Sequence, residues 1–191
     1  MFSAGNREKL LELARQAVYS AVEGRAFVAD LSRLAAGQGL GGVFVSLHRR
    51  GRLRGCVGQI MSNESLAATV AYCARAAALE DPRFDPVRPD ELKEIAIELS
   101  VLSQLEPIAP GEIESGKHGL MVSNGRNRGI LLPQVAGQFR WDGQRLLEET
   151  CVKAGLSRNA WKLPETRIQA FTAEIFRERE VPAEPNYSSS T

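Results

Sequence analysis

One short stretch of the chain brings a thiol and a guanidinium group together. Residues 54–58 read Arg-Gly-Cys-Val-Gly and follow an apolar, strand-like run and a turn that contains Gly51. Strict alternation along the returning strand places Arg54 and Cys56 on one face. The flanking glycines carry no side chain, which favours a bulge or a close approach of backbone or ligand. The stretch therefore predicts a site, although it identifies no reaction.

Cys56 is the candidate nucleophile of this stretch. A cysteine attacks a substrate or binds a metal as its thiolate, and a nearby cation such as Arg54 stabilises that form. Glu98 is the candidate base or orienting group, provided that its strand lies near the hairpin. The alternative is a small buried thiol that packs beneath a helix, as free cysteines often do. Both interpretations fit the sequence.

Histidine is scarce, since His48 and His118 are the only two in the chain. His118 precedes Gly119 at the start of a predicted strand and is a candidate catalytic proton carrier, because histidine titrates near neutrality. A surface histidine in a loop is the alternative. The two histidines form no HxH or HxxxH pair, and the three cysteines are far apart. We therefore predict no metal and no cofactor.

Cationic and amide side chains complete the candidate site. Arg83 lies in a proline-stiffened loop, and a guanidinium group grips phosphate or carboxylate in a bidentate manner. Glu98 in mid-strand needs water or a partner, and Arg54 or Arg83 is the predicted partner. Gln134 follows a strand and a proline, so it presents its amide to a ligand or caps the turn. The candidate ligand-binding residues are Arg54, Gly55, Gly58, Arg83 and Gln134.

The composition limits the possible classes of function. The chain has 191 residues, of which 43% are hydrophobic and 25% charged, as expected of one large domain or two small lobes. A net charge of +1 argues against a general nucleic-acid binder. No segment approaches the length of a membrane span, and the N-terminus lacks a signal-peptide pattern. Three cysteines without a disulfide framework lead us to expect a reducing, cytoplasmic setting.

Hydrophobic periodicity predicts the elements that position these residues. Residues 6–24, 62–81 and 142–155 carry apolar residues at helical spacing, and Asn6 and Asp142 are the predicted N-caps of the first and third helix. The strands come mainly in hairpins and not in a βαβ series, which indicates an α+β fold with a mainly antiparallel sheet covered by helices. The predicted strand segments are 42–60 (a hairpin), 94–102, 118–132 (a second hairpin) and 166–176.

Two further expectations concern the first hairpin and the chain end. A three-residue loop containing Gly51 would pair Leu47 with Leu53. A short helix is expected near residues 30–36. The charged and then Pro/Ser-rich composition predicts a flexible tail at residues 181–191, after a single domain at residues 1–180.

Six motifs, in this order, are similar to those of the AMMECR domain family, also known as protein A of the AmmeMemoRadiSam system. The signature is Leu-Arg-Gly-Cys-Val-Gly at residues 53–58, with Val57 where the family often has Ile. The resemblance extends over about residues 6–178. The other five motifs are Asp-Pro-Arg-Phe at 81–84, Glu-Leu-Ser-Val-Leu-Ser at 98–103, Gly-Lys-His-Gly-Leu at 116–120, Gly-Ile-Leu-Leu-Pro-Gln-Val at 129–135 and Cys-Val-Lys-Ala-Gly-Leu at 151–156.

The resemblance implies a two-lobed α+β fold. A larger lobe would hold a sheet with helices, and a smaller lobe would pack against it and leave a cleft. The resemblance also implies association with a Memo-like protein and a radical-SAM protein. It supplies no catalytic residues, so the site assignments above rest on chemistry alone.

Three functions fit these observations. We favour an accessory subunit that binds a ligand or partner, because two histidines and no ready-made triad suit a stand-alone catalyst poorly. The second is an enzyme that uses Cys56 as nucleophile in a cleft lined by Arg and Glu, and that modifies nucleic acid or a small molecule. The third is a scaffold that docks the Memo-like protein. A small anionic ligand fits the arginines, whereas RNA is less favoured because aromatic residues for base stacking are scarce.

Overall fold

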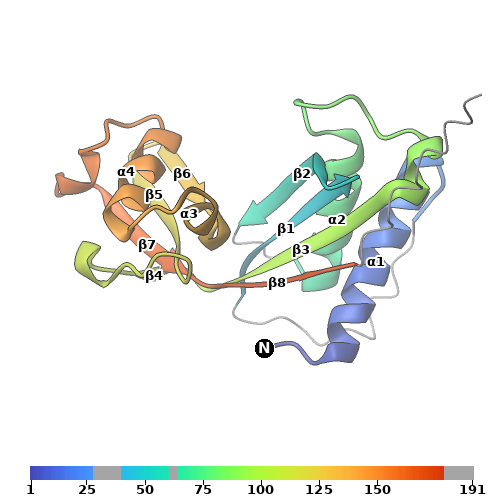
Figure 1. Ribbon diagram of the computed structural model, residues 1–191, viewed down its shortest axis with the longest axis horizontal. Coiled ribbons are helices and arrows are strands. Elements are labelled where there is room, and N and C mark those ends of the chain that lie inside the picture. Colours follow the sequence, from blue (N-terminus) through green and yellow to red (C-terminus); the bar gives the residue numbers. More distant parts are fainter. Residues whose placement is uncertain (28–39, 61–63, 179–191) are drawn as a thin grey trace, which may run out of the picture. The chain divides into compact units, whose positions relative to one another are not determined.

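The computed structural model describes residues 1–27, 40–60 and 64–178, which divide into two compact units (Figure 1). The first unit contains residues 1–27, 42–60, 64–100 and 175–178, and the second contains residues 40–41 and 101–174. The fold is α+β with antiparallel hairpins, as predicted. The predicted helix near residues 30–36 and the predicted tail at 181–191 lie outside the described residues.

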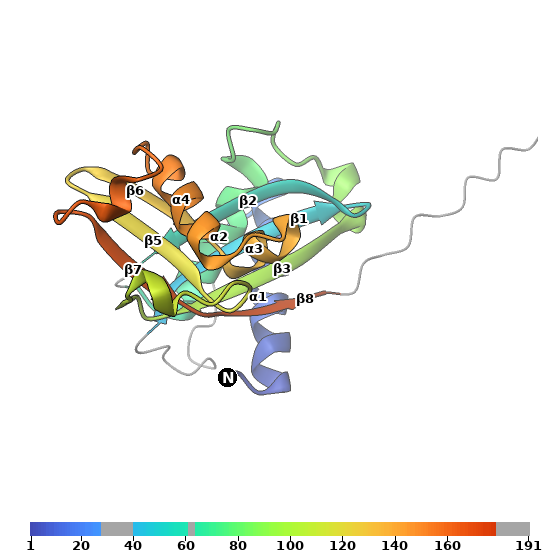
Figure 2. The same cartoon turned by 60° about the vertical axis from the view of Figure 1, so that its left-hand side comes forward.

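The first unit is built on a four-stranded sheet with the order β2-β1-β3-β8. Helices α1 and α2 pack against each other, and α2 packs on β2 (Figures 1 and 2). Buried apolar side chains of both helices and of the sheet form its core. The elements are α1 (Ala4–Val22), β1 (Leu40–Arg49), β2 (Arg52–Ile60), α2 (Leu66–Leu79), the 3₁₀ helix η2 (Pro89–Glu94), β3 (Ile95–Ser103) and β8 (Ala173–Arg177).

Serine hydroxyls begin both helices of this unit. Ser3 caps α1 and accepts a hydrogen bond from the backbone N–H of Asn6, so the prediction of Asn6 as N-cap was wrong by three residues. Ser65 caps α2 in the same way. The α2 helix then lies against β2 at Gly55, where an added Cβ would be 2.1 Å from the carbonyl oxygen of Ala77. The absent side chain of Gly55 therefore sets the distance between helix and sheet.

The β1–β2 hairpin turns through two residues and contains a bulge. Arg50 and Gly51 both have positive φ (51° and 74°), as a type I′ turn requires. The register shifts after Leu47, which pairs with Gly55, so Arg54 is the extra residue of a bulge. The predicted three-residue loop and the pairing of Leu47 with Leu53 were wrong, because the bulge takes up the residue that was assigned to the turn.

The second unit contains another four-stranded sheet, in the order β4-β7-β5-β6. Helix α4 packs on β5 and β6 and closes a small core (Figure 1). Asp142 caps α4 through the N–H of Arg145, as predicted. The elements are β4 (Glu106–Pro107), the 3₁₀ helix η3 (Pro110–Glu112), β5 (Gly119–Asn124), β6 (Asn127–Leu131), α3 (Pro133–Phe139), α4 (Gly143–Lys153), the 3₁₀ helix η4 (Ala160–Lys162) and β7 (Arg167–Phe171).

Two elements of the C-terminal half differ from the prediction. The expected strand at residues 166–176 breaks at Thr172 into β7 and β8, which belong to different sheets. Pro133 begins helix α3, where the sequence was interpreted as the end of a strand. Within the three described ranges, no helix combines the length and apolar composition that crossing a membrane requires.

Candidate functional site

Cys56 lies on β2 opposite Ser46 of β1. The Ser46 hydroxyl donates to the Cys56 sulfur at 3.3 Å, and both residues are half-buried. Because Gly55 faces α2, alternation directs Cys56 to the opposite face of the sheet. The ring of Phe44 lies over Gly58 on that face and would be 2.2 Å from an added Cβ. We call this surface, formed by Phe44, Ser46, Cys56 and Gly58, the Cys56 face.

The backbone of Cys56 is held by the loop that follows α2. Its N–H donates to the buried carboxylate of Asp81 at 2.8 Å. Arg83 donates to the same carboxylate from Nε at 2.9 Å and from a terminal nitrogen at 2.6 Å. The hydrogen bond from Arg83 is the main reason that the pKa of Asp81 lies well below its usual range. Thus Asp81 fixes both the strand and the guanidinium.

Arg83 lies close to Cys56, as the sequence-based site requires. A terminal nitrogen of Arg83 donates weakly to the Cys56 carbonyl at 3.5 Å. The pKa of Arg83 is raised mainly by its hydrogen bond to Asp81, and attraction to Cys56 also contributes. The guanidinium also lies 5.4 Å from the ring centroid of Phe84. The ion-pair partner of Arg83 is thus Asp81, not the predicted Glu98.

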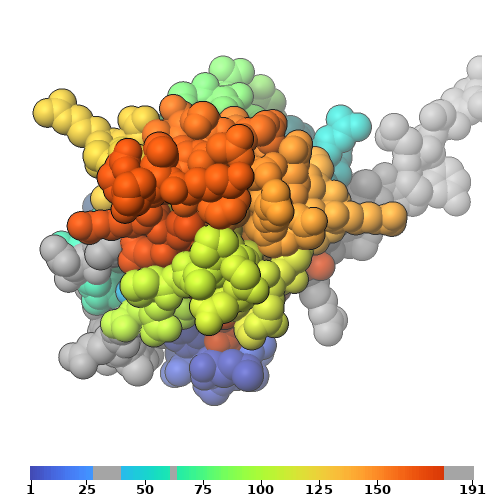
Figure 3. Space-filling model, turned by 90° about the vertical axis from the view of Figure 1, so that its left-hand side faces the viewer, coloured from blue at the N-terminus to red at the C-terminus, as the bar shows by residue number. Residues whose placement is uncertain are grey.

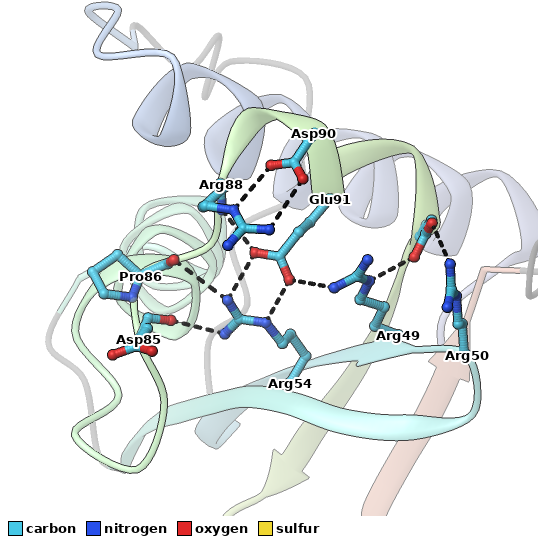
Figure 4. A network of polar contacts seen from close by, with 9 residues as sticks. Arg49, Arg50, Arg54, Asp85, Pro86, Arg88, Asp90 and Glu91 are labelled. Carbon is cyan, nitrogen blue, oxygen red and sulfur yellow. Dashed lines mark hydrogen bonds and ion pairs between the residues drawn. The ribbon is translucent and has the colours of Figure 1, made fainter.

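The Arg54 side chain makes its hydrogen bonds within the protein (Figure 4), and its ligand-binding role stays a prediction. It makes two 2.9 Å bonds to the carboxylate of Glu91. It also donates to the carbonyl oxygens of Asp85 at 2.8 Å and Pro86 at 3.3 Å. Its partner is therefore Glu91 and not the predicted Glu98. The bulge explains the direction of the Arg54 side chain, because the extra residue of a bulge does not follow the regular alternation of the strand.

Glu91 is the buried centre of this network. It also accepts bonds from Arg49 and from the backbone N–H of Arg88, each at 2.9 Å (Figure 4). Glu94 forms ion pairs with Arg49 and Arg50 and so extends the network to the hairpin turn. The hydrogen bonds from Arg54 are the main reason that the pKa of Glu91 falls from 4.5 to about 2. Ion pairs of Arg49, Arg50 and Arg54 with Glu91 and Glu94 therefore fasten the hairpin tip to η2.

This network predicts a loss of stability in acid. A carboxylate whose folded pKa is depressed stabilises the fold above its unfolded pKa, and that contribution is lost as the pH falls. For Glu91 the window runs from pH 4.5 down to about 2. Urea denaturation at pH 7, 4 and 3 should therefore give a decreasing free energy of unfolding. The Glu91→Gln variant should show a shallower decrease, and equal slopes for both proteins would contradict the assignment.

Glu98 is half-buried in β3, and its side chain has no hydrogen-bond or ion-pair partner among the described residues. Alternation places it on the face opposite the fully buried Ile97 and Leu99. Strand β1 separates β3 from β2, so the backbones of Glu98 and Cys56 are about 9 Å apart or more. At that separation Glu98 is too far away to act as a base in direct contact with the thiol. It is better placed to contact a ligand that extends from Cys56 across β1.

The two remaining predicted residues belong to the second unit. His118 is half-buried, and its Nδ1 accepts a hydrogen bond from the backbone N–H of Glu114 at 3.1 Å. Gln134 is half-buried in the first turn of α3. Cys56, Arg83 and Glu98 lie in the first unit. A single site that combines residues of both units therefore stays a prediction.

The other cysteines are packed in apolar surroundings. Cys73 and Cys151 are completely buried, and burial raises the pKa of Cys73 to about 11. We expect iodoacetamide at pH 8 to label Cys56 much faster than Cys73 or Cys151, measured by mass spectrometry of digested protein, because only Cys56 is partly exposed. Labelling of Cys73 or Cys151 at the same rate as Cys56 in folded protein would contradict this order.

Sequence reasoning missed Ser46 and Glu91, and it considered Asp81 only as a cap or ion-pair partner within its own loop, where Asp81 does pair with Arg83. Asp81 belongs to a motif that was noted, but its bond to Cys56 depends on how the loop lies beside β2. Ser46 contacts Cys56 only because of the bulged register. Within the described residues, no three His, Cys, Asp or Glu side chains are grouped as a metal site requires. The arrangement thus presents a partly exposed thiol that accepts a hydrogen bond from Ser46, on a backbone that is held in place by Asp81.

Known proteins resemble this chain over most of its length. A protein of Methanothermobacter thermautotrophicus is 44% identical over 144 residues, covering 72% of this chain and 75% of its own. A protein of Aquifex aeolicus is 35% identical over 181 residues, covering 90% and 92%. The crystal structure of the uncharacterized protein PH0010 from Pyrococcus horikoshii matches with a TM-score of 0.87 at 34% identity, covering 94% of each chain. The AMMECR1 family model matches residues 11–176. This chain therefore belongs to the AMMECR1 family.

Proposed function

We propose that this protein is an accessory subunit that binds a ligand or partner at the Cys56 face and acts together with a Memo-like protein and a radical-SAM protein. The observation that carries the proposal is the fixed frame around Cys56. The thiol is half-buried and accepts a hydrogen bond from the Ser46 hydroxyl, and the backbone N–H of Cys56 donates a hydrogen bond to Asp81. A partly exposed thiol in a frame of this kind presents a defined shape to a ligand.

The charges around the thiol support binding over stand-alone catalysis. Arg54 and Arg83 are already paired with Glu91 and Asp81. The Ser46 hydroxyl donates a hydrogen bond to the Cys56 sulfur and does not remove a proton, and the Arg83 guanidinium near the thiol already has Asp81 as its ion-pair partner. An accessory role needs shape and hydrogen bonds at the Cys56 face, and these are present.

The partner proposal is tested by measuring association directly. The full chain is mixed with the Memo-like and radical-SAM proteins of the same organism, singly and together, and the molar mass is followed by size-exclusion chromatography with light scattering. We expect a complex with at least one of them. N-ethylmaleimide on Cys56 should abolish it, because the adduct adds bulk at the Cys56 face, where a thiol is the reactive group.

The matched control is the Cys56→Ser variant treated with the same reagent. It cannot be modified at residue 56 and should keep the association, since Ser preserves the size and polarity of the site. If neither partner associates, the proposed partnership is wrong. If the adduct leaves the association unchanged, partners do not bind at the Cys56 face.

An enzyme with Cys56 as nucleophile is the second candidate, and the proximity of Arg83 to the thiol favours it. The same Cys56→Ser variant separates the two functions. An accessory subunit keeps the activity of the assembled system when serine replaces the thiol, whereas an enzyme of this kind loses it. The activity must be compared in proteins of equal thermal stability.

A further inference from the structure

We infer that the second unit contains a binding site for a small primary amine that also carries a hydrogen-bond acceptor. The site is a cavity of about 230 Å³ at the ends of β4 and β7, all of whose lining residues belong to this unit. Figure 3 shows the segment that carries β4 and η3, in yellow-green, at the surface of the unit. A cavity of this size is below that of drug-sized ligand pockets and suits a ligand of few heavy atoms.

The register of the sheet brings an acid and a histidine to the two sides of one strand. Glu106 of β4 pairs with Ala170 of β7, and Gly119 of β5 pairs with Phe171. His118 directly precedes Gly119, so Glu106 and His118 flank the end of β7. Both line the cavity. Phe171 of β7 also lines the cavity, and its ring packs over Gly119.

The charge of the cavity selects a cationic ligand. Glu106 is exposed, and its side chain has no ion-pair or hydrogen-bond partner within residues 1–27, 40–60 and 64–178. Glu106 is the one acidic residue that lines the cavity, and none of the lining residues is Lys or Arg, so the carboxylate has no cation beside it there. An ammonium group donates three hydrogen bonds, and Glu106 and the hydroxyl of Thr172 are acceptors for them. An anion would meet an unneutralised carboxylate and be repelled.

His118 supplies the second contact. Its Nδ1 already accepts a bond from the backbone N–H of Glu114, so the neutral ring carries its proton on Nε2. The Nε2–H group is then a donor for a hydroxyl or carbonyl oxygen of the ligand. An amine with an oxygen acceptor two or three bonds away satisfies both sides of the cavity, and ethanolamine is the simplest compound of this class.

The experiment titrates the full chain with ethanolamine and follows amide shifts in ¹H–¹⁵N NMR spectra. Ethylene glycol, which lacks the ammonium group, and glycolate, which carries the opposite charge, are the control compounds. We expect ethanolamine to shift the backbone amides of residues 103–106, 108, 118 and 170–172 with saturation, whereas neither control compound does so. Ethanolamine without saturable shifts, or glycolate with equal affinity, would overturn the inference.

Substitutions locate the binding groups. Glu106→Gln keeps the shape of the side chain and should weaken ethanolamine binding about ten-fold or more, because it removes a charge-assisted hydrogen bond. His118→Ala should weaken binding less, because a neutral donor is lost. The matched control is Glu165→Gln, at an exposed carboxylate of the same unit outside the cavity. Equal affinity of the Glu106→Gln variant and the unaltered protein would place the amine elsewhere.

Discussion

Replacing Glu91 with alanine is expected to lower the free energy of unfolding by about 3–5 kcal/mol, because it leaves the largely buried guanidinium of Arg54 without its anion. Glu91 has only 4% of its side chain exposed and accepts bonds from Arg54 and Arg49. The Arg54 side chain is itself only 16% exposed, so water replaces the carboxylate poorly. Urea denaturation at pH 7, followed by circular dichroism, measures the loss.

Asp90 provides the matched control for this substitution. It neighbours Glu91 in η2 and pairs with Arg88, but both partners of that pair are about two-thirds exposed (66% and 68%). Exposed ion pairs contribute about 0–1 kcal/mol, so Asp90→Ala should change stability little. If both substitutions cost the same, the buried network does not stabilise the hairpin in the way described.

Gly55→Ala is expected to destabilise the first unit by about 3 kcal/mol or more, although it adds a single methyl group. The new Cβ would lie 2.1 Å from the Ala77 carbonyl oxygen, and backbone on both sides leaves nothing that can rotate away. Helix α2 would have to move away from β2. Thermal denaturation should show a clearly lower midpoint, and hydrogen exchange should increase in α2.

Gly137→Ala is the control for the Gly55 variant. Gly137 lies within α3, and no other group is within 4 Å of an added Cβ. Alanine favours helix over glycine by up to about 1 kcal/mol, so this variant should be neutral or slightly stabilised. A destabilised Gly137 variant together with an unaffected Gly55 variant would contradict the packing described for α2 and β2.

The helices and hairpins were predictable because their signals are local. The N-caps of α2 and α4, the proline after α2 and the glycine after α4 lie within a few residues of the helix ends, and the apolar spacing of each helix is continuous. The break at Thr172 was not predictable, because the sequence reads as one apolar-alternating strand. Only the assignment of β7 and β8 to different sheets distinguishes the two halves.

The hydrogen-bond partners of the candidate site residues were not predictable from the sequence. The closeness of Arg83 to Cys56 was expected, whereas the ion pair between Arg54 and Glu91 was not. One extra residue in β2 changes the direction in which Arg54 points and the residue that faces Ser46. Such a bulge leaves no sequence signal beyond a glycine, and Gly55 has a separate packing reason.

The bonds that fix Cys56 and Arg54 also bear on how the protein behaves at high concentration. Strand β2 is an outer strand of its sheet, and outer strands offer free N–H and C=O groups to strands of other molecules. The Cys56 N–H donates a hydrogen bond to Asp81. Arg54 donates hydrogen bonds to the carbonyl oxygens of Asp85 and Pro86 and so holds the loop after α2 beside β2. The loop after α2 therefore also protects the protein from edge-to-edge self-association, and variants that detach it would aggregate before they unfold completely.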